Sequence, residues 1–169
     1  MRYLWIILAL GMGSFSLTAQ QEMSNDRMSE ILERETDDVT GEAGFWEVEY
    51  RDHMLLVVTD VANNRMRIFT PVIEEREVER EVLITMLEAN FHSALDAKYS
   101  IYEGFVISVF THPMKELTSF QFIDAMQQVV NLANNFGTTY SSTDLFFGGD
   151  QEETKEKRIN QSPSKKKRT

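Results

Sequence analysis

The sequence predicts an α+β fold, an antiparallel sheet with packed helices, in the element order α-β-β-β-α-β-β-α. Three segments repeat apolar residues at the helical period: residues 25–35, 78–95 and 118–136. Five segments have the alternation or the short apolar run of strands: residues 45–50, 54–62, 65–70, 98–102 and 105–111. Because short turns join most of these strands, we expect neighbouring strands to pair antiparallel.

Residues 1–19 have the organisation of a secretory signal peptide. Arg2 is followed by an apolar run over residues 3–10, and small residues lead to Ala19. We expect cleavage after Ala19 and export to the periplasm or the medium. The alternative is a retained membrane anchor, although the apolar run is shorter than the roughly 20 residues that a span needs.

One domain is expected over residues 20–149, with a disordered polar tail over residues 150–169 that ends in a basic run at 165–168. The domain carries 23 acidic and 9 basic residues, a net charge of −14. This charge argues against nucleic-acid binding and suits solubility or cationic partners. The chain contains no cysteine, which excludes disulfides, thiol nucleophiles and cysteine zinc sites. The basic tail could contact anionic surfaces or simply aid solubility.

The N-terminal part of the domain is expected to begin with a peripheral helix. Asn25 is in place to cap this helix, which buries Met28, Ile31 and Leu32. Residues 36–44 are acidic, contain two glycines and show no period, so we expect a loop there.

The first strands follow from period-two alternation at Trp46, Val48 and Tyr50. A turn at Asn63-Asn64 then places Asp60 opposite Arg67. Val57, Thr59, Val61, Met66 and Ile68 are expected to share one face. Pro71 is expected to end the third strand.

The helix of residues 78–95 is expected to be central to the core. Its apolar stripe comprises Val78, Val82, Leu83, Met86, Leu87, Phe91, Ala94 and Leu95. The last helix begins with a capping box at Thr118 and Gln121 and stops at Gly137. Leu145, Phe146 and Phe147 are expected to form a short apolar clasp on the domain.

Glu103-Gly104 supplies a two-residue turn for the second hairpin, because glycine adopts positive φ readily. One side of this hairpin, Tyr99, Ile101, Val106 and Phe110, is then expected to meet the central helix. The other side mixes Lys98 and Ser100 with four large apolar or aromatic residues. These four are the predicted partner-binding residues: Tyr102, Phe105, Ile107 and Val109.

No catalytic, cofactor or metal site is predicted. His53, His92 and His112 have no metal-ligand spacing, and no nucleophile elbow is present. The glutamates of residues 74–81 lack the order of a calcium loop and suit a solvated helix start.

The order of elements, together with several sequence runs, resembles the class I type III secretion chaperones and the related YbjN-like bacterial sensory-transduction regulator family. The runs are LEANF at 87–91, ALDAKYSI at 94–101, FVISV at 105–109 and Leu117-Thr118. The resemblance covers about residues 44–139. It implies a non-enzymatic protein that forms a homodimer and binds partner polypeptides. Secretion chaperones work in the cytoplasm, whereas this chain carries an export signal.

The sequence therefore favours an exported, non-enzymatic polypeptide-binding or interaction module without stable membrane insertion after signal cleavage. The alternative is a small envelope hydrolase or ligand-binding protein whose site is assembled only in three dimensions. An enclosed pocket with convergent polar groups would favour the alternative.

The signal pattern makes a direct prediction. Protein isolated from the native host should begin at or near Gln20, because the small residues before it suit a signal peptidase. N-terminal mass spectrometry measures this. An intact Met1 in a membrane fraction would establish the anchor instead.

Overall fold

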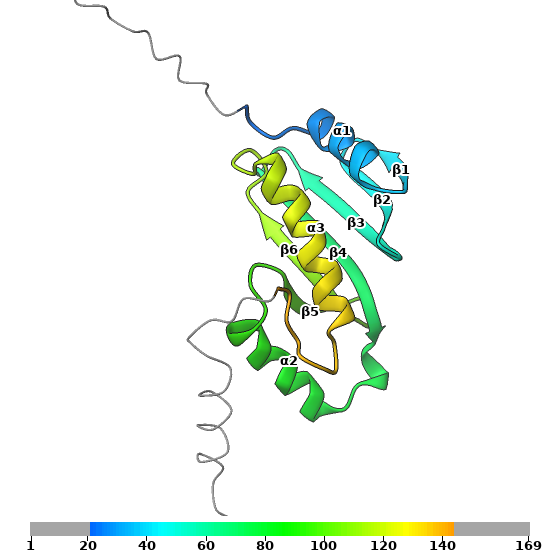
Figure 1. The fold of residues 1–169 in the computed structure, drawn as a ribbon, viewed down its shortest axis with the longest axis vertical. Coiled ribbons are helices and arrows are strands. Elements are labelled where there is room, and N and C mark those ends of the chain that lie inside the picture. Colours follow the sequence, from blue (N-terminus) through cyan, green and yellow to red (C-terminus); the bar gives the residue numbers. More distant parts are fainter. Residues whose placement is uncertain (1–20, 144–169) are drawn as a thin grey trace, which may run out of the picture.

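The computed structural model describes residues 21–143 (Figure 1). Its helices are α1 (Asn25–Glu35), the short 3-10 helix η1 (Glu75–Glu77), α2 (Arg80–His92) and α3 (Ser119–Asn134). Its strands are β1 (Asp38–Glu42), β2 (Phe45–Tyr50), β3 (His53–Asp60), β4 (Arg65–Glu74), β5 (Lys98–Tyr102) and β6 (Phe105–His112). They form one antiparallel sheet in the order β1-β2-β3-β4-β6-β5. The predicted α+β class is confirmed.

The main core lies between α3 and one face of the sheet. Figure 1 shows α3 crossing in front of the central strands and α1 lying in front of β1 to β3. The sheet register aligns Val57, Ile68 and Phe110 across three strands, and all three are buried. The buried side of α3 includes Phe122 and Met126. Each such side chain contributes roughly 1.5–3 kcal/mol by leaving water.

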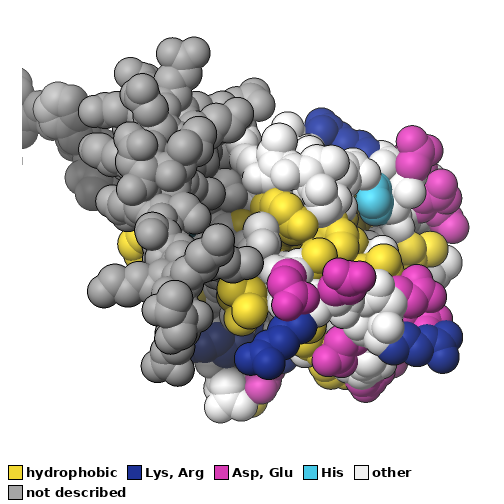
Figure 2. Space-filling view, turned by 90° about the horizontal axis from the view of Figure 1, so that it is seen from below, with side chains coloured by type: hydrophobic (Ala, Val, Ile, Leu, Met, Phe, Trp, Pro, Cys, Tyr) yellow, Lys and Arg dark blue, Asp and Glu magenta, His cyan; other side chains and the backbone are white. Residues whose placement is uncertain are grey.

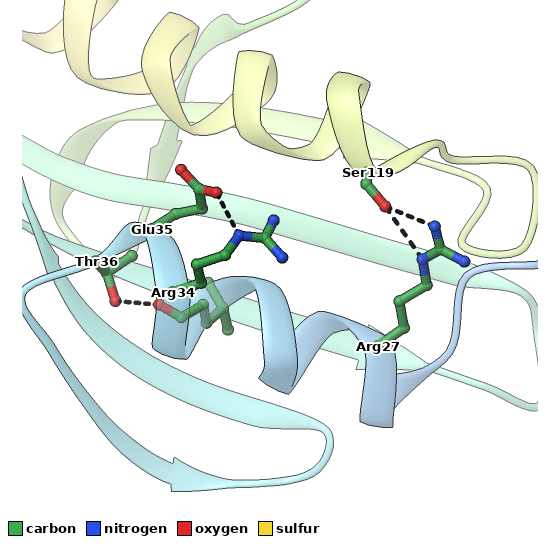
Figure 3. A network of polar contacts seen from close by, with 6 residues as sticks. Arg27, Arg34, Glu35, Thr36 and Ser119 are labelled. Atoms are coloured by element: carbon green, nitrogen blue, oxygen red, sulfur yellow. Dashed lines mark hydrogen bonds and ion pairs between the residues drawn. The ribbon is translucent and has the colours of Figure 1, made fainter.

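Helix α1 is held at both ends by polar contacts. Ser24, rather than the predicted Asn25, caps it by accepting a hydrogen bond from Arg27 N. The Arg27 guanidinium donates two hydrogen bonds, of 3.1 and 2.9 Å, to Ser119 Oγ of α3 (Figure 3). At the other end, Thr36 Oγ1 donates to Leu32 O at 2.7 Å (Figure 3). The two helices on this face of the sheet are therefore linked directly.

The predicted loop of residues 36–44 is wrong, because most of it is the edge strand β1. Val39 pairs with Val48 of β2 and is the only partly buried residue of the strand. Because four of its five residues are exposed, β1 does not alternate apolar with polar residues. The sequence pattern that predicts a strand is therefore absent there. Gly41 has a φ of 102°, and a Cβ there would collide with Phe45 O. Glycine thus permits the tight approach to β2 instead of marking a loop.

The predicted pairing of Asp60 with Arg67 is also wrong. Asp60 lies opposite Arg65, and the connection between β3 and β4 is a four-residue turn. The Asp60 carboxylate accepts hydrogen bonds from the Asn63 side chain at 2.8 Å and from Asn63 N at 3.0 Å. These bonds hold the pKa of Asp60 below its usual value. The longer turn leaves Val61 exposed, outside the face on which it was predicted to lie. The other four residues predicted for that face do share it: Val57, Thr59, Met66 and Ile68.

Pro71 does not end the strand that contains it. Strand β4 continues to Glu74, and its pairing with β6 shifts between Pro71 and Ile73. A bulge of this kind accommodates a residue without a backbone N–H. Helix α2 consequently begins at Arg80 and is shorter than the predicted span of 78–95.

The predicted central role of the second helix belongs instead to α3. Only Met86 and Ala89 of α2 are buried, whereas α3 buries eight residues. Helix α2 lies at one end of the molecule beside β5 (Figure 1). The Asn90 side chain fixes it there, since its Oδ1 accepts from Tyr99 N at 2.7 Å and its Nδ2 donates to Tyr99 O at 3.0 Å. Ile101, predicted to meet the central helix, is 44% exposed.

The predicted start of the last helix is confirmed, because Thr118 and Gln121 form the capping box. The helix ends at Asn134, three residues before the predicted stop at Gly137, which has a φ of 76° in the turn that follows. The predicted signal, the clasp residues 145–147 and the tail lie outside the described residues. Within residues 21–143, no helix has the length and apolarity required to cross a membrane.

The turn after β3 yields a test of the fold. Asn64 has a φ of 53°, its Oδ1 accepts from Lys115 N at 2.8 Å, and its Nδ2 donates to Glu116 at 2.9 Å. Asn64→Ala should lower the free energy of unfolding by about 1–3 kcal/mol, because it loses both bonds and strains the backbone. Urea denaturation measures the change. The control Asn63→Ala, which loses one exposed bond, should cost about 1 kcal/mol or less, and equal losses would contradict this account.

Candidate polypeptide-binding surface

The face of the sheet opposite α3 carries an apolar surface that no described helix covers. Side chains alternate between faces along each strand, so the register determines which residues lie there. One row across the sheet contains Leu56, Phe69 and Val109. Adding their apolar neighbours on the same face defines the open-face patch: Phe45, Met54, Leu56, Val58, Phe69, Tyr102, Phe105, Ile107 and Val109.

Several members of the open-face patch are accessible to a partner. Met54 is 52% exposed, Tyr102 51%, Phe45 44% and Phe105 39%. An area of exposed aromatic and aliphatic side chains on this scale typically marks an interaction surface.

The four predicted partner-binding residues all belong to the open-face patch. The predicted register of the hairpin is the observed one, with Tyr102 opposite Phe105. Tyr102 and Phe105 are exposed and Val109 is half-buried, whereas Ile107 is 6% exposed. Ile107 therefore supports the patch from within the sheet, and an aspartate there would bury a charge instead of testing binding.

The other five members, which come from β2, β3 and β4, were missed by sequence reasoning. A signal for them was present, because residues 54–58 are apolar at odd and even positions alike. A continuous apolar run indicates a strand with both faces out of water. Leu55 and Val57 enter the core, so Leu56 and Val58 must lie on the open face.

Aromatic and charged contacts order one side of the patch. The rings of Phe69 and Tyr102 meet edge to face with centroids 6.0 Å apart. The Glu103 carboxylate, which pairs with the phenol, raises the pKa of Tyr102. Lys98, beside Val109, donates to Asn90 O at 2.6 Å and Ala94 O at 2.9 Å. Burial lowers the pKa of Lys98, and its ammonium group serves to hold the end of α2.

The histidines are engaged separately rather than gathered in a site. His53 Nε2 lies 2.9 Å from Asn134 Oδ1, and His112 Nδ1 lies 2.8 Å from Pro113 O. Among the described residues, no group of three histidine or carboxylate side chains is placed to hold a metal ion.

Two hollows in the described part of the chain, residues 21–143, are built mainly from charged or polar residues. The larger, about 660 Å³, lies where η1 and α2 meet the β5–β6 turn and is lined by Glu74, Glu75, Arg76, Val78, Arg80, Leu83, Glu103, Gly104 and Phe105. The smaller, about 250 Å³, is lined by Asp96, Phe110, Thr111, His112, Leu117, Gln121 and Asp124. Asp96 and Asp124 both accept from the buried Gln128 amide, at 3.4 and 2.7 Å. These carboxylates are therefore part of a structural hydrogen-bond network.

Comparison with known proteins identifies solved structures that have a similar fold. No family model and no curated protein sequence matches the chain. A chain of the HopA1-SchA chaperone-effector complex superposes with a TM-score of 0.52 and 12% identity, covering 66% of this chain and 94% of that one. A chain of the ExsC-ExsE complex gives a TM-score of 0.50 and 10% identity, covering 64% and 90%.

The chain therefore has a chaperone-like fold. A third similar structure is the Yersinia pestis type III secretion chaperone SycH in complex with a fragment of YscM2, with a TM-score of 0.49, 14% identity and coverages of 64% and 98%. The first two superpositions confirm the chaperone-like fold predicted from the order of elements. The described domain thus spans nearly the whole length of the chaperone-like chains that it matches.

Proposed function

We propose that this chain is an exported, non-enzymatic module that binds an extended polypeptide across its open-face patch and also forms a homodimer. The observation that carries the proposal is the patch itself. It extends over β2, β3, β4, β6 and β5 without a described helix above it. A sheet that needed only one buried face would place polar residues at these positions.

The shape of the patch favours a polypeptide over a small molecule. Its rows cross strands spaced about 4.8 Å apart, so the apolar area is broad and follows the surface of the sheet. A small ligand is usually held in a concave site that buries most of its surface. An extended chain can instead place alternate side chains on a flat apolar surface. Similar folds occur in chaperone-effector complexes, which supports this choice of partner.

Export and the absence of catalysis have separate support. The pattern of residues 1–19 supports export. The similarity to chaperones, which are not enzymes, supports a non-catalytic role. The hydrolase or ligand-binding alternative would need a nucleophile or a free polar group directed into a hollow. Asp96 and Asp124, the carboxylates of the smaller hollow, are instead engaged by Gln128.

The open-face patch is also the surface predicted for a homodimer. A second copy could cover it as a partner polypeptide would, and the two would then exclude each other. Both uses depend on apolar contact with β3 and the second hairpin. A single charge in the patch should therefore weaken both.

Met54→Glu tests this use of the patch. Met54 is 52% exposed, so a carboxylate there stays solvated in the free protein but opposes an apolar partner. In pull-downs from native envelope or medium, we expect the mature variant to recover at least about tenfold less partner protein than the parent. The reason is that burying an unpaired charge under the partner costs several kcal/mol. Light scattering at matched concentrations measures self-association of the same proteins.

Val61→Glu is the matched control. Val61 is 53% exposed in the turn after β3 and lies outside the open-face patch. Both variants should keep their unfolding free energy within roughly 0.5 kcal/mol of the parent, as exposed substitutions usually do. If Met54→Glu recovers the same partners as Val61→Glu, the patch is not the binding surface.

A further inference from the structure

A second exposed apolar surface lies on α2. Ile84, Leu87 and Phe91 are 46%, 61% and 79% exposed. Their spacing of three and four residues places them in one line along the helix, here called the α2 stripe. Figure 2 views the molecule from the α2 end and shows hydrophobic side chains at that end among acidic and basic ones. The α2 stripe is separate from the open-face patch, because it belongs to a helix beside the sheet.

The described chain ends close to the C-terminal end of α2. Leu95 N donates to Ser142 Oγ at 2.7 Å, and Ser93 Oγ donates to Tyr140 O at 2.8 Å. Ser141 Oγ also donates to Ser93 O at 3.3 Å. From the other side, Asn131 Nδ2 of α3 donates to Ser142 O at 3.2 Å, and Ser142 is fully buried. The chain therefore leaves Thr143 from a fixed point beside the residues that follow α2.

The residues that come next are suited to the α2 stripe. Leu145, Phe146 and Phe147 form a short apolar run, followed by Gly148 and Gly149. At about 3.3–3.6 Å per extended residue, these side chains reach roughly 7–14 Å beyond Thr143. Ser93 lies about 9 Å along the helix axis from Leu87 and about 13 Å from Ile84, at 1.5 Å per residue. The reach of the run thus matches the distance to the stripe.

We propose that residues 145–147 of the same chain dock on the α2 stripe. In an extended run Leu145 and Phe147 point to the same side, where they can face the stripe, and the fixed end at Ser142 brings the two together. Docking removes apolar surface from water on both partners, which is the driving force. The two glycines that follow then let the remaining tail turn away from the helix.

A segment of the same chain suits the stripe better than a second copy does. A tether of a few residues gives an effective concentration in the millimolar range, without the entropy lost when two molecules associate. Three side chains in one line also provide far less than the roughly 800 Å² per partner of a standard stable interface. The stripe is thus matched in size to a short segment.

Engineered cysteines test the proposal in the full mature chain. The native sequence has no cysteine, so Glu88→Cys with Gly148→Cys introduces one defined pair. Glu88 lies on the exposed side of α2 near Leu87, and the two substitutions leave the stripe and the run intact. With oxidised glutathione, we expect an intramolecular disulfide to form at least about tenfold faster than in the control pair Val61→Cys with Gly148→Cys. Thiol titration and non-reducing electrophoresis measure the rate.

The control pair places its first cysteine in the turn between β3 and β4, at the far end of the sheet from α2 (Figure 1). Adding Phe91→Ser to the Glu88→Cys pair should lower its rate toward that of the control, because the stripe is interrupted. Equal rates for the two pairs would overturn the proposal, as would a rate unaffected by Phe91→Ser. Disulfide-linked dimers that form faster at higher protein concentration would also overturn it, by assigning the stripe to a second copy.

Discussion

The packing of α3 against one face of the sheet is the contact on which the other features depend. A helix of 16 residues is about 24 Å long, enough to cover the central strands but not a six-stranded sheet. Phe122 and Met126 are buried under it, as is Ile68 of β4. Helix α1 completes the same face over β1 to β3. No described helix remains for the opposite face, because α2 is held beside β5 by Asn90.

This one-sided cover leaves several apolar residues of β3 outside the core. Leu55 and Val57 are fully buried beneath the helices, whereas their neighbours Leu56 and Val58 lie on the open face. Apolar residues on the open face contribute little to this core. Because they are accessible, they favour association with other polypeptides. Retaining them is consistent with a surface that is covered by a polypeptide, as proposed above. The chaperone-like fold offers a broad sheet face for this purpose.

Much of the fold could be predicted from the sequence, but the relative importance of its helices could not. The hairpin at Glu103-Gly104 and the capping box at Thr118 are local features, so their sequence patterns suffice. Residues 78–95 were predicted to form the central helix, yet α3 occupies the core. Periodicity shows that a helix has an apolar side, but not what that side contacts. The exposed Phe91 illustrates the difference.

The remaining errors have similar physical causes. Strand β1 was missed because backbone pairing to β2, rather than side-chain burial, holds an edge strand in place. The shift at Asp60 was missed because side-chain capping by Asn63 selects a longer turn. Within the open-face patch, the residues of the second hairpin could be predicted from local register. The apolar run of residues 54–58 indicated a strand with two apolar faces. Joining it to the hairpin in one patch required the order of strands in the sheet, which brings β3 and β4 next to β6.

The central claim is that one face of the sheet is buried and the other is open. Methyl NMR of residues 20–169 with a soluble nitroxide measures this directly, since the probe broadens signals that it can approach. The account predicts strong broadening of the Leu56, Val58 and Val109 methyls and little broadening of their neighbours Leu55, Val57 and Val106. Equal protection of both sets in a monomer would contradict it, because the open face would then be covered by the protein itself.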